Sequence, residues 1–291
     1  MSDLEKYKDP NNIYKKMWDK YENINKLPCF YRDIIKIDFN EFEKKVYSND
    51  IKSSKNIVNS LLAGDVYLLK NTFSKSYLKE LKNETAKTWK AKKSEFFKIY
   101  EDCPNFYRAI TEDLANMYSF KQIKQAQYFF PWNPDFCNLY QETYKRWRVL
   151  KYLSGFYKDV WEKDTPKDGI VDRIQIVKYP PNSGLLEPHQ DPYIYQKFFI
   201  SVYLSKKGED FKEGGMYFIN ENKTKFMFDD LVDVGDMAFG FATLYHGVDI
   251  SKTIEKTSNN DTAGRWFMGL YTTVSDYVEN RHTGKPARHL K

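Results

Sequence analysis

Cysteine is scarce in this chain of 291 residues. Its three thiols, Cys29, Cys103 and Cys137, are an odd number, lie far apart and form no Cys-x-x-Cys pair. The sequence therefore encodes neither a disulfide framework nor a zinc site built from thiolates. We expect three ordinary buried or half-buried thiols.

Long apolar runs are missing as well. No stretch reaches the roughly 18 consecutive apolar residues that are needed to span a bilayer, and the first ten residues lack the apolar run of a secretory signal. These absences predict a cytoplasmic protein with no membrane partner. Aromatic residues, by contrast, make up 17% of the chain and the whole hydrophobic set 41%, which favours a packed globular core over wholesale disorder.

Positive charge is concentrated in the first half. The net charge is +6, but residues 1–150 hold 27 basic against 20 acidic side chains, whereas residues 151–291 hold 19 against 20. The excess is densest between Lys75 and Lys98. Such a run fits either an anionic partner or the solvated face of an amphipathic helix. We favour the helix face because no arginine cluster accompanies the lysines, and we do not expect nucleic acid as a partner.

The spacing of hydrophobic residues changes near residue 164. Before it, aromatic and aliphatic side chains recur every three or four residues from Tyr140 to Trp161, which predicts a long helix with a buried stripe. After it, the pattern alternates and predicts strands at residues 172–179, 198–204, 215–219, 237–241 and 265–274. Short strands between Gly, Pro and Asn turns favour a β-sandwich or barrel. Residues 65–71 also resemble a strand, one that leads into a helix over residues 77–98.

Two of the four histidines occur in settings that suit a metal. His189 opens a His-x-Asp sequence, and in a strand the side chains of His189 and Asp191 would point to the same face. A second imidazole from His246 would complete two nitrogens and one carboxylate, a set that suits Fe(II) and leaves positions open for other ligands. The alternative is that these histidines are unrelated, because His-x-Asp alone is a common chance match.

Five elements then follow one another in a fixed order. The first is a strand with a glycine-bearing turn that ends in His-x-Asp (173–191), and the second is an apolar strand (199–205). A strand that begins with Gly-Gly (213–218) and a further strand (234–239) follow. The last element is a histidine followed by a strand that begins with Gly-Arg-Trp (246–266). In this order they resemble the 2-oxoglutarate- and Fe(II)-dependent oxygenases, especially their prolyl 4-hydroxylase-like branch. The resemblance covers about residues 171–275, with weaker similarity back to the strand near Val66.

The resemblance implies an α+β protein whose core is a double-stranded β-helix, the jelly-roll or cupin-like barrel, supported by N-terminal helices. We place this catalytic core at residues 169–278. An N-terminal extension packed on the core (1–60) and a mainly helical support region (61–168) precede it, and a basic tail (279–291) follows. Because no repeat and no low-complexity linker separates these parts, we expect one structural unit.

The resemblance also implies the ligands of the metal and of the co-substrate. His189, Asp191 and His246 would bind Fe(II), and Arg265 would bind the C5 carboxylate of 2-oxoglutarate, since the planar guanidinium matches a carboxylate. Arg265 follows His246 by 19 residues (265 minus 246), which is wider than the usual spacing. The polar residues 249–263 resemble a loop insertion that accounts for the difference.

Further roles follow from the same resemblance. Lys252 and Lys256, which lie in the polar loop, are the alternatives to the arginine as anchor. Tyr203 would add a hydrogen bond to the C5 carboxylate, unless it only packs in the barrel, and Tyr179 would lie near the co-substrate. Because alternate residues of a strand share a face, Arg173 and Gln175 would lie beside Tyr179 on the strand predicted for residues 172–179, and they are our candidate substrate contacts.

The implied reaction uses O2 and 2-oxoglutarate, releases succinate and CO2, and hydroxylates an unactivated C–H bond. Asp191 is present, whereas halogenating relatives have a small residue at that position, so we expect no halogenation; desaturation or cyclisation stays open. The signatures of nucleic-acid demethylases are absent, because Val177 and Tyr271 stand where that pattern has Asn and Arg.

The substrate class is left open by the sequence. We favour a small metabolite or biosynthetic intermediate over a protein or peptide side chain of the prolyl type. The large aromatic helical portion suggests a pocket wall or the surface of a homodimer. A non-catalytic barrel that binds an anionic ligand and a redox-neutral metalloenzyme of the cupin type are the alternatives from other classes.

Overall fold

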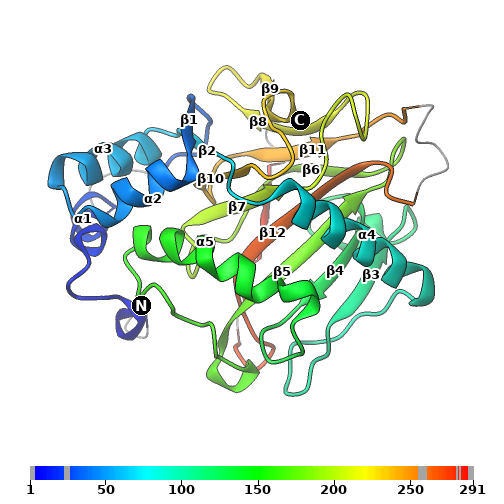
Figure 1. Cartoon of the computed structure of the whole chain (residues 1–291), viewed down its shortest axis with the longest axis horizontal. Coiled ribbons are helices and arrows are strands. Elements are labelled where there is room, and N and C mark those ends of the chain that lie inside the picture. The colour runs from blue at the N-terminus through cyan, green and yellow to red at the C-terminus, as the bar shows by residue number, and fades with distance from the viewer. Residues whose placement is uncertain (1–3, 23–26, 255–260, 280, 282, 288–291) are drawn as a thin grey trace.

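The computed structural model describes residues 4–22, 27–254, 261–279, 281 and 283–287. Its centre is a mixed sheet of 13 strands that folds over on itself, with helices along one side (Figure 1). The strands are β1 Ile34–Asp38, β2 Val66–Lys70, β3 Phe106–Ile110, β4 Gln122–Phe129, β5 Ile170–Tyr179, β6 Leu185–Gln190, β7 Phe198–Tyr203, β8 Gly215–Ile219, β9 Lys225–Met227, β10 Met237–Phe241, β11 His246–Asp249, β12 Arg265–Val274 and β13 Lys285–Pro286. The α-helices are α1 Ile13–Tyr21, α2 Phe39–Tyr47, α3 Ile51–Leu62, α4 Lys75–Ala91 and α5 Leu139–Leu153.

The order of the strands is that of a rolled-up sheet, in which all named pairs except the parallel β1 and β2 are antiparallel. Along the main path it reads β1-β2-β10-β7-β12-β5-β4-β6-β11-β8-β9, while β3 pairs with β4 and β13 with β6. Strand β4 joins the two layers, because it pairs with β5 along one part of its length and with β6 through Gln122 and Ile123. The predicted α+β fold with a double-stranded β-helix core is confirmed.

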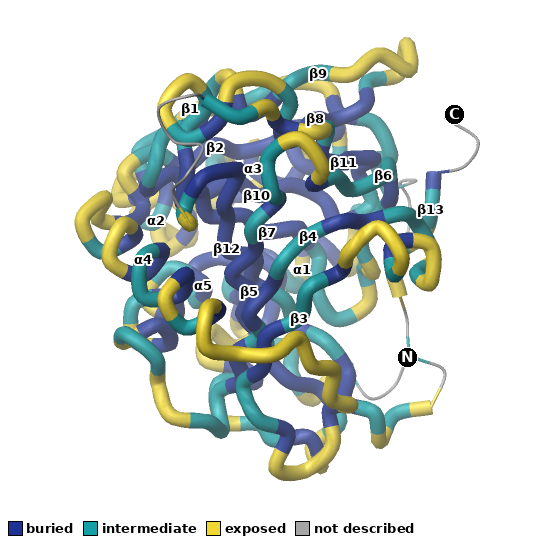
Figure 2. Tube along the Cα trace, turned by 90° about the vertical axis from the view of Figure 1, so that its right-hand side faces the viewer, coloured by how far each residue is buried: buried dark blue, intermediate teal, exposed yellow. Residues whose placement is uncertain are grey.

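Most of the predicted strands are confirmed with nearly the predicted bounds. The predictions for β8, β10 and β12 match the observed strands, and those for β2, β5 and β7 differ by one or two residues at an end. Strands β5 and β12 pair antiparallel over ten residues each, Ile170–Tyr179 with Arg265–Val274. In Figure 2 most residues of β5, β7 and β12, in the middle of the molecule, are coloured as buried.

The predicted long helix from Tyr140 to Trp161 is wrong beyond Leu153. Helix α5 ends there, and Gly155 follows with a φ of 89°, which a side chain would strain. A Cβ on this glycine would also lie 2.9 Å from the Cα of Lys15. The aromatic residues after the turn pack in a cluster of their own against Ile170 and Val274. The helix predicted over residues 77–98 likewise ends early, at Ala91.

The support region at residues 61–168, which was predicted to be mainly helical, holds strands as well as helices. It contains α4 and α5 but also three strands, of which the sequence predicted only β2. Strands β3 and β4 extend the sheet beside β5. Part of the barrel wall therefore precedes residue 169, where we expected the core to begin.

The N-terminal helices are positioned by caps and by the shared core. Side chains of Asn12, Asp38, Asp50 and Ser74 accept hydrogen bonds from the first turns of α1 to α4. One hydrophobic cluster runs from Tyr14 in α1 through the helices into the barrel strands. The N-terminal helices and the barrel therefore share a continuous core.

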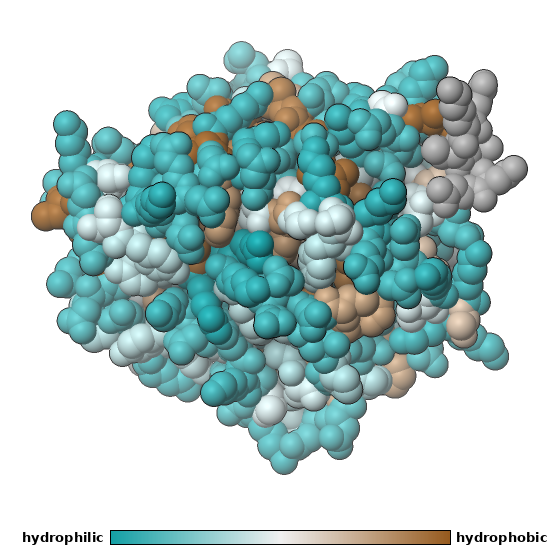
Figure 3. Space-filling model, in the orientation of Figure 1, coloured by the Kyte–Doolittle hydropathy of each residue, from teal (hydrophilic) through white to brown (hydrophobic). Residues whose placement is uncertain are grey.

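The lysine-rich α4 lies on the outside of the sheet, and its charges are largely met by acids. Lys75 pairs with Asp233 at 2.6 Å and Lys87 with Glu84 at 2.5 Å, and both lysines are exposed. The face in Figure 3 is mostly hydrophilic, with hydrophobic residues in small areas only. These pairs support the interpretation as a solvated helix face. No helix in the described ranges has the length and hydrophobicity that crossing a bilayer requires.

Candidate active site

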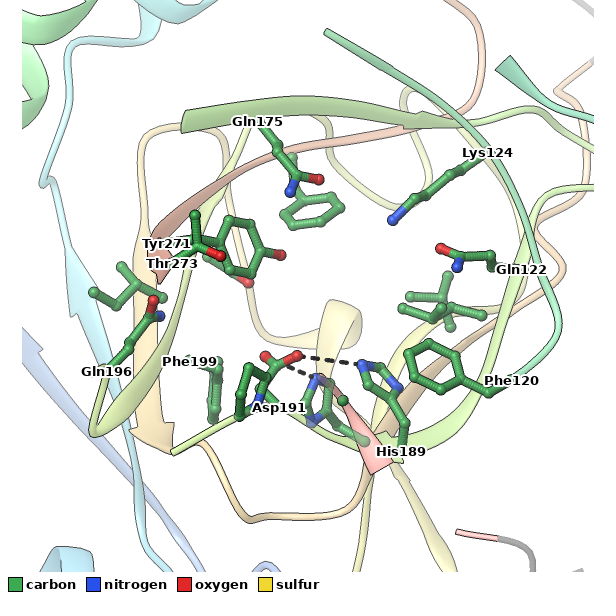
Figure 4. A pocket seen from close by; sticks show the side chains of 18 of the residues that line it. Phe120, Gln122, Lys124, Gln175, His189, Asp191, Gln196, Phe199, Tyr271 and Thr273 are labelled. Atoms are coloured by element: carbon green, nitrogen blue, oxygen red, sulfur yellow. Dashed lines mark ion pairs between the residues drawn. The ribbon is translucent and has the colours of Figure 1, made fainter. Parts of the chain in front are cut away.

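The three predicted metal ligands meet at the facing ends of two neighbouring strands. His189 lies near the end of β6, Asp191 follows that strand directly, and His246 begins β11, where it pairs with His189. The Nε2 atoms of His189 and His246 lie 3.6 and 3.7 Å from the two oxygens of Asp191. Their ligand atoms all lie within 4.8 Å of one another (Figure 4). The prediction that these residues converge is confirmed.

Backbone carbonyls orient both imidazoles. The Nδ1 atom of His189 lies 3.0 Å from the carbonyl oxygen of Glu187, and that of His246 lies 2.8 Å from the carbonyl of Leu244. Because a carbonyl oxygen can only accept, Nδ1 carries the proton in each ring. The lone pair of each Nε2 is therefore free for a metal, as in most histidine metal sites.

The protonation states also suit a metal. Burial, together with the neighbouring His189, lowers the pKa of His246 to about 4. Burial alone would raise the pKa of Asp191, but its contacts with His189 and His246 and the charge of Lys124 outweigh this and lower it. Near neutral pH the site thus offers a carboxylate and a neutral His246 imidazole, which is the donor set that a divalent transition metal binds.

A cavity of about 270 Å³ opens onto these ligands inside the barrel. It is lined by the three ligands, by four other residues that the sequence singled out, and by residues that it missed. The four are Arg173, Gln175, Tyr179 and Arg265. Tyr203 is absent from this lining. The cavity therefore joins the metal ligands with most of the predicted co-substrate and substrate contacts in a single space.

Arg265 is held in the wall of the cavity by an aspartate that the sequence analysis missed. Its Nε and Nη2 atoms donate to the two carboxylate oxygens of Asp229, which lies in the short 3-10 helix Phe228–Asp230. Both side chains are 2% exposed. Asp229 outweighs burial and raises the pKa of Arg265. No hydrogen bond from Nη1 occurs among the described residues, so this end of the guanidinium is available to a ligand.

The glycine pair at the entry of β8 makes room for this aspartate. Oδ2 of Asp229 accepts from the backbone nitrogen of Met216 at 3.0 Å, and a Cβ on Gly215 would lie 2.3 Å from the same oxygen. The φ of Gly215 is also 103°. Only glycine at position 215 therefore allows the Asp229 carboxylate to approach this closely. In the sequence, the Gly-Gly motif is the one signal that another group packs against the backbone at the start of β8.

The two predicted tyrosines differ in their surroundings. The hydroxyl of Tyr179 is buried in the cavity wall and has no hydrogen-bond partner among the described residues. A buried polar atom without a partner is costly, so this hydroxyl suits a polar ligand. The hydroxyl of Tyr203 instead lies 3.3 Å from Sδ of Met216, and its ring lies 5.7 Å from the guanidinium carbon of Arg265. Its hydrogen bond to a co-substrate stays a prediction.

The predicted substrate contacts interact with each other. Arg173 and Gln175 both project from β5 into the cavity. With its amide oxygen turned toward the arginine, Gln175 accepts from Nε and Nη2 of Arg173 at 3.1 and 2.8 Å. The rings of Tyr128 and Tyr271 lie 5.7 and 5.2 Å from the guanidinium carbon. These contacts fix the arginine at the cavity wall.

Several cavity residues escaped the sequence analysis. Gln122 and Lys124 reach in from β4, and the ring of Phe120 stacks on His189 with centroids 4.4 Å apart. Arg281 lines the cavity from the segment that we predicted as a basic tail. The sequence analysis missed these residues because they lie outside residues 171–275, the part of the chain that carries the recognised motifs.

The alternative lysine anchors lie elsewhere. Lys252 is exposed and pairs with Glu213 at 3.0 Å, so it does not line the cavity. Lys256 lies outside the described residues, as do His282, His289 and the middle of the predicted loop insertion, residues 255–260.

Comparisons with known proteins add evidence on the fold. No protein-family model matches the sequence, and neither does any curated protein. Among solved structures, a full-length Neurospora crassa protein in complex with alpha-KG matches with 13% identity and a TM-score of 0.51, over 88% of this chain and 94% of that one. The complex of the same Neurospora crassa protein with alpha-KG and thymine matches with 12% identity and a TM-score of 0.50, over 89% and 94%.

This chain shares the double-stranded β-helix fold of these Neurospora crassa structures. A Pseudomonas putida prolyl-4-hydroxylase also matches, with 12% identity and a TM-score of 0.46 over 75% of this chain and 97% of that one. The identities are low, so the likeness concerns the course of the backbone.

Proposed function

We propose that this protein is an Fe(II)- and 2-oxoglutarate-dependent oxygenase that hydroxylates a C–H bond of a small molecule. The observation that carries the proposal is that His189, Asp191 and His246 meet in the same cavity as Arg265. A two-histidine, one-carboxylate set leaves coordination positions open, as non-heme Fe(II) oxygenases require. The fold of the solved complexes with alpha-KG supports the same assignment.

Each side chain of the site has a defined task in this proposal. The Nε2 atoms of His189 and His246 and the carboxylate of Asp191 hold the metal. Bound Fe(II), together with 2-oxoglutarate and O2, supplies the oxidising chemistry that yields succinate and CO2. Arg265 binds the C5 carboxylate through its free Nη1, since Asp229 fixes the orientation of the guanidinium.

Other cavity residues support the co-substrate. The unpartnered hydroxyl of Tyr179 is available to donate to it, and Tyr203 could do the same only by giving up its contact with Met216. Phe199, Phe267 and Val248 form an apolar part of the wall. Apolar walls exclude water and strengthen the electrostatic contacts inside the site.

A small substrate is favoured by the cavity itself. Its volume of about 270 Å³ lies just below the roughly 300–1,000 Å³ of typical ligand pockets. It would have to hold both the co-substrate and the reacting part of the substrate. The Neurospora crassa complex with thymine shows that the fold can take a small second ligand in that protein. A protein or peptide side chain is the second candidate. Because Asp191 supplies a carboxylate to the metal set, we propose hydroxylation rather than halogenation.

Spectroscopy of the metal complex tests the proposal. Under anaerobic conditions, Fe(II) and 2-oxoglutarate should together produce a weak visible charge-transfer band in the wild type. His246→Ala should lose the band, because two remaining ligands hold the metal poorly. Lys87→Ala changes an exposed lysine of α4 and should keep it.

Two results would contradict the proposal. They are a wild-type protein that shows no band with Fe(II) and 2-oxoglutarate, and a band of full intensity in His246→Ala. If the band forms, screening metabolites and peptides for stimulated succinate formation would decide between the two substrate classes.

A further inference from the structure

The cavity carries an excess of positive charge. Four cationic side chains line it, Lys124, Arg173, Arg265 and Arg281, against a single acidic one, Asp191. Two of the four are neutralised, since Arg265 pairs with Asp229 and Arg281 with Asp276. Lys124 and Arg173 have no carboxylate within ion-pairing distance in the part of the chain that the structure describes.

This lack of partners is unusual for this molecule. Among the described residues, the two lysines that are buried are paired, Lys151 with Asp172 and Lys82 with Asp210, and Lys197, whose side chain is 11% exposed, pairs with Glu22. A cation that is withdrawn from water without a counter-charge is costly. Lys124 and Arg173 both bear this cost, which an anion in the cavity would offset.

The two cations are half-buried and act on each other. Withdrawal from solvent lowers the pKa of Lys124 to about 8, and the charge of Arg173 contributes to this shift. Withdrawal from solvent also lowers the pKa of Arg173. In Figure 4 the ammonium group of Lys124 points into the cavity from the side opposite His189 and Asp191. The positive charge therefore faces the space above the metal ligands.

Metal and co-substrate would not remove this excess. The double positive charge of Fe(II) would be met by the Asp191 carboxylate and the two carboxylates of 2-oxoglutarate, leaving a single negative charge in surplus. Lys124 and Arg173 together outweigh that surplus. A net positive charge remains in the cavity, and a further anionic group would neutralise it.

We propose that Lys124 and Arg173 form a subsite for an oxyanion, a carboxylate or a phosphate group, that the small-molecule substrate carries. Gln175 is a positioning residue of this subsite, because its amide oxygen holds Nε and Nη2 of Arg173 and leaves Nη1 for the ligand. The assignment of this ligand as the substrate rests on the proposed function. The excess of positive charge in the cavity is observed independently of that proposal.

Calorimetric titration of the anaerobic protein, loaded with Fe(II) and saturated with 2-oxoglutarate, tests the subsite. The probes are benzoate, its neutral analogue benzamide, and inorganic phosphate. We expect benzoate or phosphate to bind at least about tenfold more tightly than benzamide, as expected for a charge-assisted contact. The anion that binds more tightly, benzoate or phosphate, indicates whether the substrate carries a carboxylate or a phosphate group.

Variants separate this subsite from the co-substrate anchor. Arg173→Gln and Lys124→Met should each weaken anion binding about fivefold or more and leave the affinity for 2-oxoglutarate within about twofold. Arg265→Gln should have the reverse effect. Lys121→Met, just before the same strand, removes a lysine that pairs with Glu112 and does not line the cavity, and should change neither affinity.

Three results would overturn the inference. The first is that benzoate and phosphate bind no better than benzamide, and the second is that both subsite variants still bind these anions as tightly as the wild type. The third is that the subsite variants lose as much affinity for 2-oxoglutarate as Arg265→Gln does, which would make the two cations part of the co-substrate anchor. Failure of the proposed function would look different, because the wild type would then lack the Fe(II)–2-oxoglutarate band. In that case the same anion titration of the metal-free protein would still decide whether the subsite exists.

Discussion

At the scale of single residues, the pair of Arg265 and Asp229 is the most constrained feature of the site. A buried guanidinium without a counter-charge would be costly in the absence of co-substrate, and Asp229 removes that cost. The aspartate also leaves only part of the arginine for a ligand. The pair thus orients the anchor before the co-substrate arrives.

Substitution of the arginine should affect 2-oxoglutarate directly. Arg265→Ala should raise the dissociation constant of 2-oxoglutarate by an order of magnitude or more, because a charged hydrogen-bonding partner contributes about 1.5–3 kcal/mol. Titration of the charge-transfer band measures this. An unchanged affinity would move the anchor to another cation of the cavity.

The stability of the same pair can be measured by a double-mutant cycle. Asp229→Asn and Arg265→Gln should each lower the free energy of unfolding by about 3–5 kcal/mol, because each leaves an uncompensated buried charge. The double variant should lose clearly less than the sum of the two, since neither charge remains. Urea unfolding gives the three values, and strict additivity would show that the pair is not coupled.

At the scale of elements, β5 organises the site. It carries Arg173, Gln175 and Tyr179, pairs with β12 on one side and with β4 on the other, and is tied to α5 by a fully buried ion pair between Lys151 and Asp172. Thr272 of β12 donates to the same aspartate at 3.1 Å. Helix, strand and neighbouring strand are thus fixed at one point.

This tie should contribute strongly to stability. Lys151→Met leaves Asp172 buried without its cation and should lower the free energy of unfolding by about 3–5 kcal/mol in urea. Lys145→Met, on the same helix, removes an exposed partner of Glu142 and should cost no more than about 1 kcal/mol. Similar losses for the two variants would mean that the buried pair contributes no more than a surface one.

The elements also show what the sequence could predict. Strands such as β8, β10 and β12 were predicted correctly because burial leaves a short apolar run between turn residues. Strand β4 was missed because Gln122 and Lys124 face a polar cavity, so the usual contrast between the faces is absent. The His-x-Asp motif is local and could be read directly. Asp229 comes from a distant segment, and its contact with Arg265 depends on the folded chain.

At the scale of the whole molecule, helices and barrel form one hydrophobic core. A ligand that binds only the native state should therefore stabilise the entire chain. At concentrations about a hundred times the dissociation constant the gain is about 2.7 kcal/mol. For a chain of this size each kcal/mol corresponds to roughly 2–4 °C in Tm.

We accordingly expect anaerobic Fe(II) with 2-oxoglutarate to raise the Tm by several degrees in a thermal melt. His246→Ala should show little of this shift, and Lys87→Ala should show all of it. Addition of a strong metal chelator should reverse the shift. Equal shifts in the wild type and His246→Ala would mean that the ligands stabilise the fold from another place. The homodimer and the cytoplasmic location stay predictions.

The position of β12 has a consequence for biosynthesis. This strand lies between β5 and β7, both of which leave the ribosome before it. Until β12 arrives, the two earlier strands face each other across a gap with unpaired backbone groups, the kind of exposed edge that promotes aggregation. A nascent chain that stalls before this strand therefore carries a complete set of metal ligands in an open and vulnerable sheet, and chaperones would have to protect it until β12 inserts.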